Sequence, residues 1–192
     1  MLINNLTICD PAVGSGHFLV SALNELICIK HDLKILQYRH NGQRIREYSL
    51  EIVNDELIIQ DIETEELFTY TLNQKGNSKT ELQQLQETLF HEKETLIENC
   101  LFGVDINPNS VKICRLRLWI ELLKNAYYTS ESHFTQLETL PNIDINIKQG
   151  NSLISRFALD ADMAPALQKS KFSIEAYKAA VQTYRNADNK EE

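Results

Sequence analysis

The fold of this chain is decided by one stretch near its start, Asp10-Pro11-Ala12-Val13-Gly14-Ser15-Gly16-His17-Phe18-Leu19. The apolar residues 6–9 before it predict a short buried strand, and the residues from Phe18 to about Leu36 predict a buried helix. Glycines in the turn between them let the backbone approach a ligand, and the new helix offers unpaired N–H groups. Asp10 falls at the carboxyl end of the strand, where open α/β sheets bind ligands. A carboxylate there suits a ligand with a cationic amine.

Two common phosphate-binding motifs do not fit the residues around Gly16. The dinucleotide fingerprint requires a further glycine three positions on, and that position is Leu19. A phosphate-binding P-loop requires Gly-Lys-Ser/Thr, and Gly16 is followed by His17. The alternative to a ligand-binding loop is a glycine turn that binds nothing.

A second strand and turn occupy residues 100–108, which read Cys-Leu-Phe-Gly-Val-Asp-Ile-Asn-Pro. The strand ends at Asp105, and Pro108 is tolerated at the first position of the helix predicted up to Lys124. A carboxylate at a strand end accepts both hydroxyl donors of a ribose. The alternative is that Asp105 only caps the following helix.

A third strand and turn occupy residues 145–153. Ile145 and Ile147 fall on one face of the predicted strand, and Gly150-Asn151 follows as a turn. Taken alone, this segment indicates a turn and nothing more.

Together, the three segments resemble the adenine-specific DNA methyltransferases, most closely the large ones of combined restriction–modification enzymes and related phage-defence systems. The match to their first motif lies in Asp-Pro-Ala-x-Gly-Ser-Gly-x-Phe-Leu, and the helix over residues 111–124 is also similar. The resemblance covers about residues 5–36 and 80–192. It implies an α/β fold: a partial Rossmann-like class I methyltransferase sheet with helices on both faces.

The same resemblance implies that the chain binds S-adenosyl-L-methionine. The loop would hold the methionine end, Asp105 the ribose, and Ile106 would pack on the adenine face. Asn151 would accept the exocyclic amine of the adenine, where many relatives have Asp. The implied cofactor-binding residues are Asp10, Pro11, Ala12, Gly14, Ser15, Gly16, Phe18, Asp105, Ile106, Asn151 and Ser152.

The reacting motif of that family, Asn/Asp-Pro-Pro-aromatic, does not occur in the chain. Its nearest counterpart, Asn107-Pro108-Asn109, follows the second strand and lacks a second proline and an aromatic residue. We therefore expect a fragment, truncated at both ends, with no catalytic residue and no methyl transfer of its own. In the family the first strand is central, so a fragment without the fourth strand would leave that strand with an unpaired edge. We expect self-association through that edge, or packing of the helical tail over it.

The chain carries an insertion between its first two motifs. Asp105 follows Gly16 by 105 − 16 = 89 residues, whereas nucleotide-binding units place the acid about 20 residues after the loop. Alternating apolar residues and turn signals within residues 37–79 predict two or three short antiparallel strands. Thr80 and Gln83 then form a capping-box pattern at a helix start. We predict an incomplete core over residues 1–155 that contains this insertion, and a helical linker over 156–192.

Composition indicates a cytoplasmic domain without a membrane span or a signal peptide. The four cysteines lack zinc or redox spacing, and the histidines show no metal-ligand pattern. The net charge of −8 has the wrong sign for a nucleic-acid surface, so DNA would be bound by regions outside this chain. Two alternatives stay open: a methyltransferase acting on RNA, protein or a small molecule, and a non-catalytic cofactor-binding or assembly module.

Overall fold

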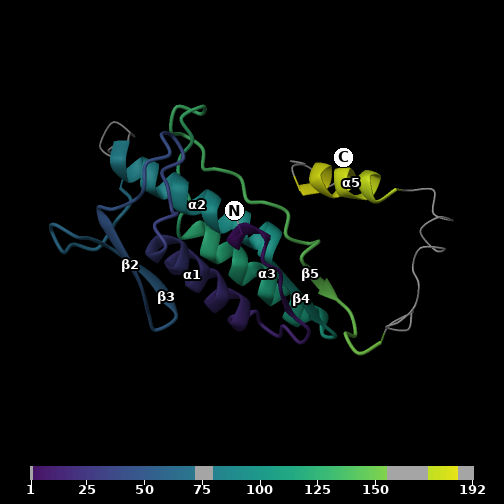
Figure 1. The fold of residues 1–192 in the computed structure, drawn as a ribbon. Coiled ribbons are helices and arrows are strands. Elements are labelled where there is room, and N and C mark those ends of the chain that lie inside the picture. Colours follow the sequence, from purple (N-terminus) through teal and green to yellow (C-terminus); the bar gives the residue numbers. More distant parts are fainter. Residues whose placement is uncertain (1, 72–79, 155–172, 186–192) are drawn as a thin grey trace.

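The computed structural model describes residues 2–71, 80–154 and 173–185 of the chain (Figure 1). Three parallel strands form its main sheet, in the order β1-β4-β5: β1 is Ile8–Asp10, β4 is Leu101–Asp105 and β5 is Ile147–Gln149. Ile8 pairs with Leu101, and Gly103 pairs with Ile147. The three segments singled out in the sequence are therefore neighbouring strands whose carboxyl ends meet at one edge.

The first and third strands are shorter than predicted. β1 begins at Ile8, because Leu6 follows a short 3₁₀ turn, η1 (Ile3–Asn5), and lies exposed. β5 begins at Ile147, because a turn in which the Asn146 N–H donates to the Ile143 carbonyl precedes it. Ile145 is thus outside the strand in which it was predicted.

Helix α1 spans His17–Asp32 and ends before Leu36, the end predicted from apolar residues. Lys34 has a left-handed φ of 58°, and its N–H donates to the His31 carbonyl. The N–H of Ile35 donates to the Lys30 carbonyl, which completes a Schellman motif. Leu36 is buried all the same, because the chain folds back over the helix end.

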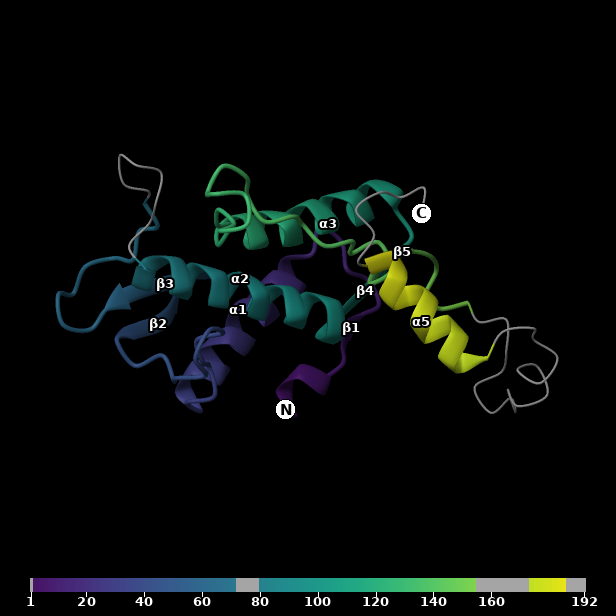
Figure 2. The ribbon, with the colours of Figure 1, turned by 90° about the horizontal axis from the view of Figure 1, so that it is seen from above.

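Three helices pack against the sheet: α1, α2 (Thr80–Cys100) and α3 (Pro108–Leu123). Each contacts β4 and the other two helices, so the three pack together against the sheet (Figure 2). The predicted placement of helices on both faces of the sheet stays a prediction.

The described part of the insertion, residues 37–71, contains a β-hairpin in which β2 (Tyr48–Val53) is antiparallel to β3 (Glu56–Asp61). Its two turn residues, Asn54 and Asp55, both have positive φ, as a type I′ turn requires. A third strand from Leu67 was one of the predicted possibilities, but the described residues there give only a single bridge, between Leu67 and Gln60.

Helix α5 (Ile174–Arg185) confirms a helix near the end of the chain. The Asn142 side-chain amide donates to the Tyr184 carbonyl, and the Tyr184 hydroxyl donates to Asp144 at 3.5 Å. The rest of the predicted linker, residues 156–172 and 186–192, lies outside the described residues.

All four cysteines are free thiols: Cys28, Cys100 and Cys114 are buried, and Cys9 is exposed. Among the described residues, no helix combines the length and the apolar character that crossing a membrane requires.

Candidate cofactor site

The glycine loop between β1 and α1 is docked onto the middle strand of the sheet by Val13. This side chain is buried, and its N–H donates to the Val104 carbonyl at 2.9 Å. Gly103 makes room for it, because a Cβ on Gly103 would lie 2.8 Å from Val13 Cγ2. The loop thus depends on two residues that sequence reasoning did not assign to the site, and a glycine inside an apolar strand was the available signal.

Both loop glycines have left-handed backbone angles, and their surroundings differ. Gly16, at the N-cap of α1, has φ 80°, and a Cβ there would lie 2.6 Å from the Cys114 sulfur on α3. Gly14 has φ 52°, and its nearest atom to a built Cβ is the Ala12 oxygen, 3.9 Å away. Gly16 is therefore required for packing, while Gly14 leaves space on the outer side of the loop. Burial raises the pKa of the Cys114 thiol to about 11, so it stays protonated at neutral pH.

Asp105 joins the loop to the second strand. Its Oδ2 accepts the Gly14 N–H at 2.9 Å, and its Oδ1 accepts the Asn107 N–H at 2.8 Å. Each oxygen keeps a lone-pair site for a further donor. The residue that caps α3 is Asn107, whose side chain accepts the Asn109 N–H, so Asp105 does not act as the helix cap.

Asp10 lies at the end of the neighbouring strand, as predicted. Its Oδ1 accepts the Ala12 N–H at 3.0 Å, which shapes the first turn of the loop. Pro11 and Ala12 are exposed, and Ser15 is half-buried. Two carboxylates thus flank the same glycine loop, one from each of two adjacent strand ends.

Two apolar side chains border the loop and are free of the core. Ile106 is 69% exposed, and Phe18, in the first turn of α1, is 55% exposed. The sequence predicted Phe18 as the start of a buried helix, and this is wrong for that side chain, because Leu19 and Leu23 form the buried face. The side chains of Ile106 and Phe18 are therefore open to solvent beside the glycine loop.

Asn151 is joined to the site through the backbone. The Gly150 N–H donates to the Asp105 carbonyl at 3.0 Å, which connects the ends of β5 and β4. Asn151 Oδ1 accepts the Leu153 N–H at 3.0 Å, and both Asn151 and Ser152 are exposed. The Asn151 oxygen keeps one acceptor position open toward solvent.

The hairpin turn reaches the start of α1. His17 Nε2 lies 3.6 Å from Asp55 Oδ2, with both side chains largely exposed. This surface contact joins the first residue of α1 to the inserted hairpin.

Fold and site define a class: an α/β domain with parallel strands, whose glycine loop is held between two strand-end carboxylates. The chain belongs to the family described as "MmeI, DNA-methyltransferase domain", whose model matches residues 1–177. This confirms the resemblance to methylase domains of restriction–modification enzymes.

Two similar proteins have names that combine a restriction enzyme with a methyltransferase. The chain is 32% identical over 152 residues, 79% of its length, to "Putative type II restriction enzyme and methyltransferase RM.MjaORFECS2P" of Methanocaldococcus jannaschii. It is 35% identical over 82 residues, 41% of its length, to "Type II restriction enzyme and methyltransferase RM.Eco57I" of Escherichia coli. These matches cover 9% and 8% of the relatives, so the chain corresponds to under a tenth of each. No solved structure matches the chain.

Proposed function

We propose that this chain is the S-adenosyl-L-methionine-binding part of an adenine-specific DNA methyltransferase that acts in restriction–modification or a related defence system. The observation that carries the proposal is the hydrogen bond from the Gly14 N–H to Asp105, which couples the glycine loop to the acid of the next strand. Family membership supports a methyltransferase, and the arrangement of the strand ends supports a nucleoside-bearing methyl donor. In this reading the sheet is a partial class I methyltransferase fold, with residues 37–79 inserted.

Each proposed contact follows from the chemistry of its residue. Asp10 pairs with the cationic amine of the methionine end, and the loop backbone lies against the methionine chain. The free lone pairs of Asp105 accept the ribose hydroxyls, while Ile106 covers one adenine face and Asn151 accepts the adenine amine. Bound there, the cofactor supplies an electrophilic methyl group.

The methyl acceptor is proposed to be held by other parts of the enzyme. The Asn/Asp-Pro-Pro-aromatic motif that presents a flipped adenine does not occur in these 192 residues. The net charge of −8 also opposes DNA binding by this segment. We therefore expect the chain alone to bind cofactor without transferring methyl, and the whole enzyme to act on cytoplasmic DNA.

Titration calorimetry with S-adenosyl-L-methionine tests the proposal. The wild-type chain is expected to bind with 1:1 stoichiometry, and Asp105→Ala to weaken binding at least tenfold, because the ribose acceptor and the loop anchor are both lost. Asp32→Ala is the control: it removes an exposed carboxylate at the far end of α1 and is expected to leave affinity unchanged.

The outcomes separate the alternatives. No heat from the wild-type chain would contradict the proposal and favour an assembly module. Equal affinity of wild type and Asp105→Ala would contradict the assigned site. Methylation of RNA or protein, but not DNA, by the full-length enzyme would contradict the proposed substrate.

A further inference from the structure

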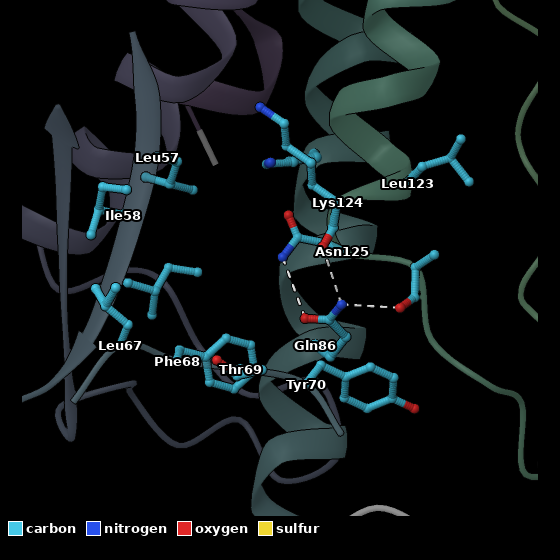
Figure 3. A pocket seen from close by; sticks show the side chains of 13 residues that line it. Leu57, Ile58, Leu67, Phe68, Thr69, Tyr70, Gln86, Leu123, Lys124 and Asn125 are labelled. Atoms are coloured by element: carbon cyan, nitrogen blue, oxygen red, sulfur yellow. Dashed lines mark hydrogen bonds between the residues drawn. The ribbon is translucent and has the colours of Figure 1, made fainter. Parts of the chain in front are cut away.

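A cavity lies away from the glycine loop, between the inserted hairpin, α2 and the C-terminal end of α3. Its volume is about 460 Å³, and Figure 3 shows its two unlike walls. One wall is apolar and comes from the hairpin and the segment after it: Leu57, Ile58, Ile59, Leu67 and Phe68. The other is polar and comes from α2 and the residues just after α3: Gln86, Lys93, Lys124 and Asn125.

Most groups of the polar wall already have hydrogen-bond or ion-pair partners within the protein. Gln86 Nε2 donates to the Lys124 and Ala126 carbonyls, and Gln86 Oε1 accepts from the Asn125 amide. Lys124 pairs with Glu56 at 3.3 Å and with Glu121 at 2.8 Å. These groups hold the end of α3 against α2 and are not free to bind a ligand.

Lys93 differs from them because it is a buried amine in the wall of an open cavity. Its side chain is only 2% exposed, and its Nζ donates to the Glu121 carbonyl at 3.2 Å. Burial lowers the pKa of the Lys93 ammonium to about 8, with the nearby Lys124 charge acting in the same direction and Glu121 opposing it. A substantial share of the amine is therefore uncharged and nucleophilic at mildly alkaline pH.

Glu121 offers a place for the proton that such an amine gives up. Its Oε2 lies 3.5 Å from Lys93 Nζ, is buried, and has no hydrogen-bond partner. Its other oxygen is occupied by Lys124. One buried carboxylate oxygen thus faces the amine with its acceptor capacity unused.

We propose that this cavity binds a small apolar aldehyde, which Lys93 captures as an imine. The Lys93 ammonium passes one proton to Glu121 Oε2, and the nitrogen lone pair forms a bond to the carbonyl carbon. The carbonyl oxygen takes up two protons, one from the nitrogen and one back from Glu121, and leaves as water, so the C=N bond replaces the C=O bond without a change of oxidation state. The protonated imine keeps one N–H for the Glu121 carbonyl and leaves its charge beside the Glu121 carboxylate.

The cavity favours an uncharged carbonyl compound over an anion or a cation. Both lysine charges are compensated by Glu56 and Glu121, so an incoming anion finds no unpaired positive charge. An incoming cation would lie against Lys93 and Lys124. The apolar wall, in contrast, suits a short hydrocarbon chain.

Reductive trapping with butanal and sodium cyanoborohydride at pH 8, followed by peptide mapping, tests the proposal. Lys93 is expected to be butylated at least tenfold faster than Lys112 and Lys148, which are exposed internal references. In urea-unfolded protein the three lysines are expected to react at similar rates. Labelling of Lys93 no faster than Lys112 in the folded protein would overturn the proposal.

A cavity-filling variant keeps Lys93 and tests the site itself. Leu57→Trp places an indole in the apolar wall and is expected to slow Lys93 labelling at least fivefold, with Lys112 unchanged. The matched control is Leu153→Trp, which adds the same ring at a side chain that is 93% exposed. Unchanged Lys93 labelling in folded Leu57→Trp would overturn the proposal.

Discussion

Asp105 shows how one carboxylate organises a loop and a ligand position together. It anchors the Gly14 N–H from one side and the Asn107 N–H from the other, so its orientation is set before any ligand arrives. The sequence predicted its place at a strand end and its role as a ligand acceptor. The hydrogen bond from the Gly14 N–H to Asp105 was not predictable, because it depends on how closely Val13 packs against Gly103.

The two loop glycines are expected to respond differently to substitution. Gly16→Ala places a Cβ against Cys114 and adds left-handed strain, so it is expected to lower the free energy of unfolding by roughly 3 kcal/mol. In Gly14→Ala the added Cβ meets open space. Only the backbone strain remains, and it is expected to lower the free energy of unfolding by about 1 kcal/mol. Urea denaturation of both variants measures the difference, and equal losses would show that Cys114 does not constrain Gly16.

Lys93 is expected to make stability rise with pH on the alkaline side. Its pKa is about 8 in the folded chain and near 10.5 when unfolded, so between these values unfolding takes up a proton. Lys93 therefore destabilises the fold at neutral pH. Between pH 8 and pH 10 this destabilisation decreases, and the free energy of unfolding rises by roughly 2 kcal/mol.

Comparison with Lys93→Met by urea denaturation isolates that contribution. The difference in unfolding free energy, wild type minus variant, is expected to increase from pH 8 to pH 10. Lys112→Met, at an exposed position on α3, serves as control and is expected to give a difference that does not change with pH. A flat difference for Lys93→Met would show that its amine is not desolvated.

At the scale of elements, α2 passes into β4 without a loop, since the helix ends at Cys100 and the strand begins at Leu101. The buried Asn146 amide makes this junction possible. Its Nδ2 donates to the carbonyls of Ile97, Glu98 and Leu101 at 2.9–3.0 Å. The first two belong to the last turn of α2, whose carbonyls have no intrahelical donors, and the third belongs to the first residue of β4. Nothing in the local sequence marks Asn146 for this role, since it acts some 45 residues away.

Removing that amide is expected to destabilise the fold strongly. Asn146→Ala leaves buried carbonyls unsatisfied, and we expect a loss of about 3 kcal/mol in the free energy of unfolding, measured in urea. Asn142→Ala is the control, because within the described residues its amide donates one long bond, 3.4 Å, to the Tyr184 carbonyl, and a change below about 0.5 kcal/mol is expected. Comparable losses for the two variants would contradict the role given to Asn146.

The apolar periodicity of helix α3 does not decide which face of the helix is buried. Its sequence has two apolar stripes, and the structure buries the one containing Val111, Cys114, Leu118 and Leu122. The other, with Ile113, Leu116, Ile120 and Leu123, is exposed. Glu121 lies one helical turn after Arg117, yet it pairs with Lys93 and Lys124, because the helix turns it toward α2. Both stripes satisfy helical spacing, so only tertiary packing distinguishes them.

For the whole molecule, the order β1-β4-β5 leaves one side of β1 without a strand among the described residues. The sequence predicted this arrangement through family resemblance, and self-association through the free edge stays a prediction. In contrast, the burial of the hairpin against α1 was not predictable, since alternation predicts strands without saying what they pack on.

Sedimentation velocity in the presence of reductant tests the edge. The wild-type chain is expected to show a sedimentation coefficient that rises with concentration. Cys9→Lys places a charge on the exposed strand and is expected to shift the chain toward monomer, whereas Cys9→Ser is expected to behave as wild type. A wild-type chain that stays monomeric at every concentration would contradict this prediction.

The central claim is that S-adenosyl-L-methionine binds across the carboxyl ends of the three parallel strands. An amide NMR titration of the isotope-labelled chain with the cofactor tests it most directly. The account predicts that Gly14, Gly16, Ile106 and Asn151 shift together along one binding curve, while Leu57 and Phe68 in the hairpin cavity stay unchanged. Shifts centred on the hairpin cavity, or no shifts at saturating cofactor, would contradict it.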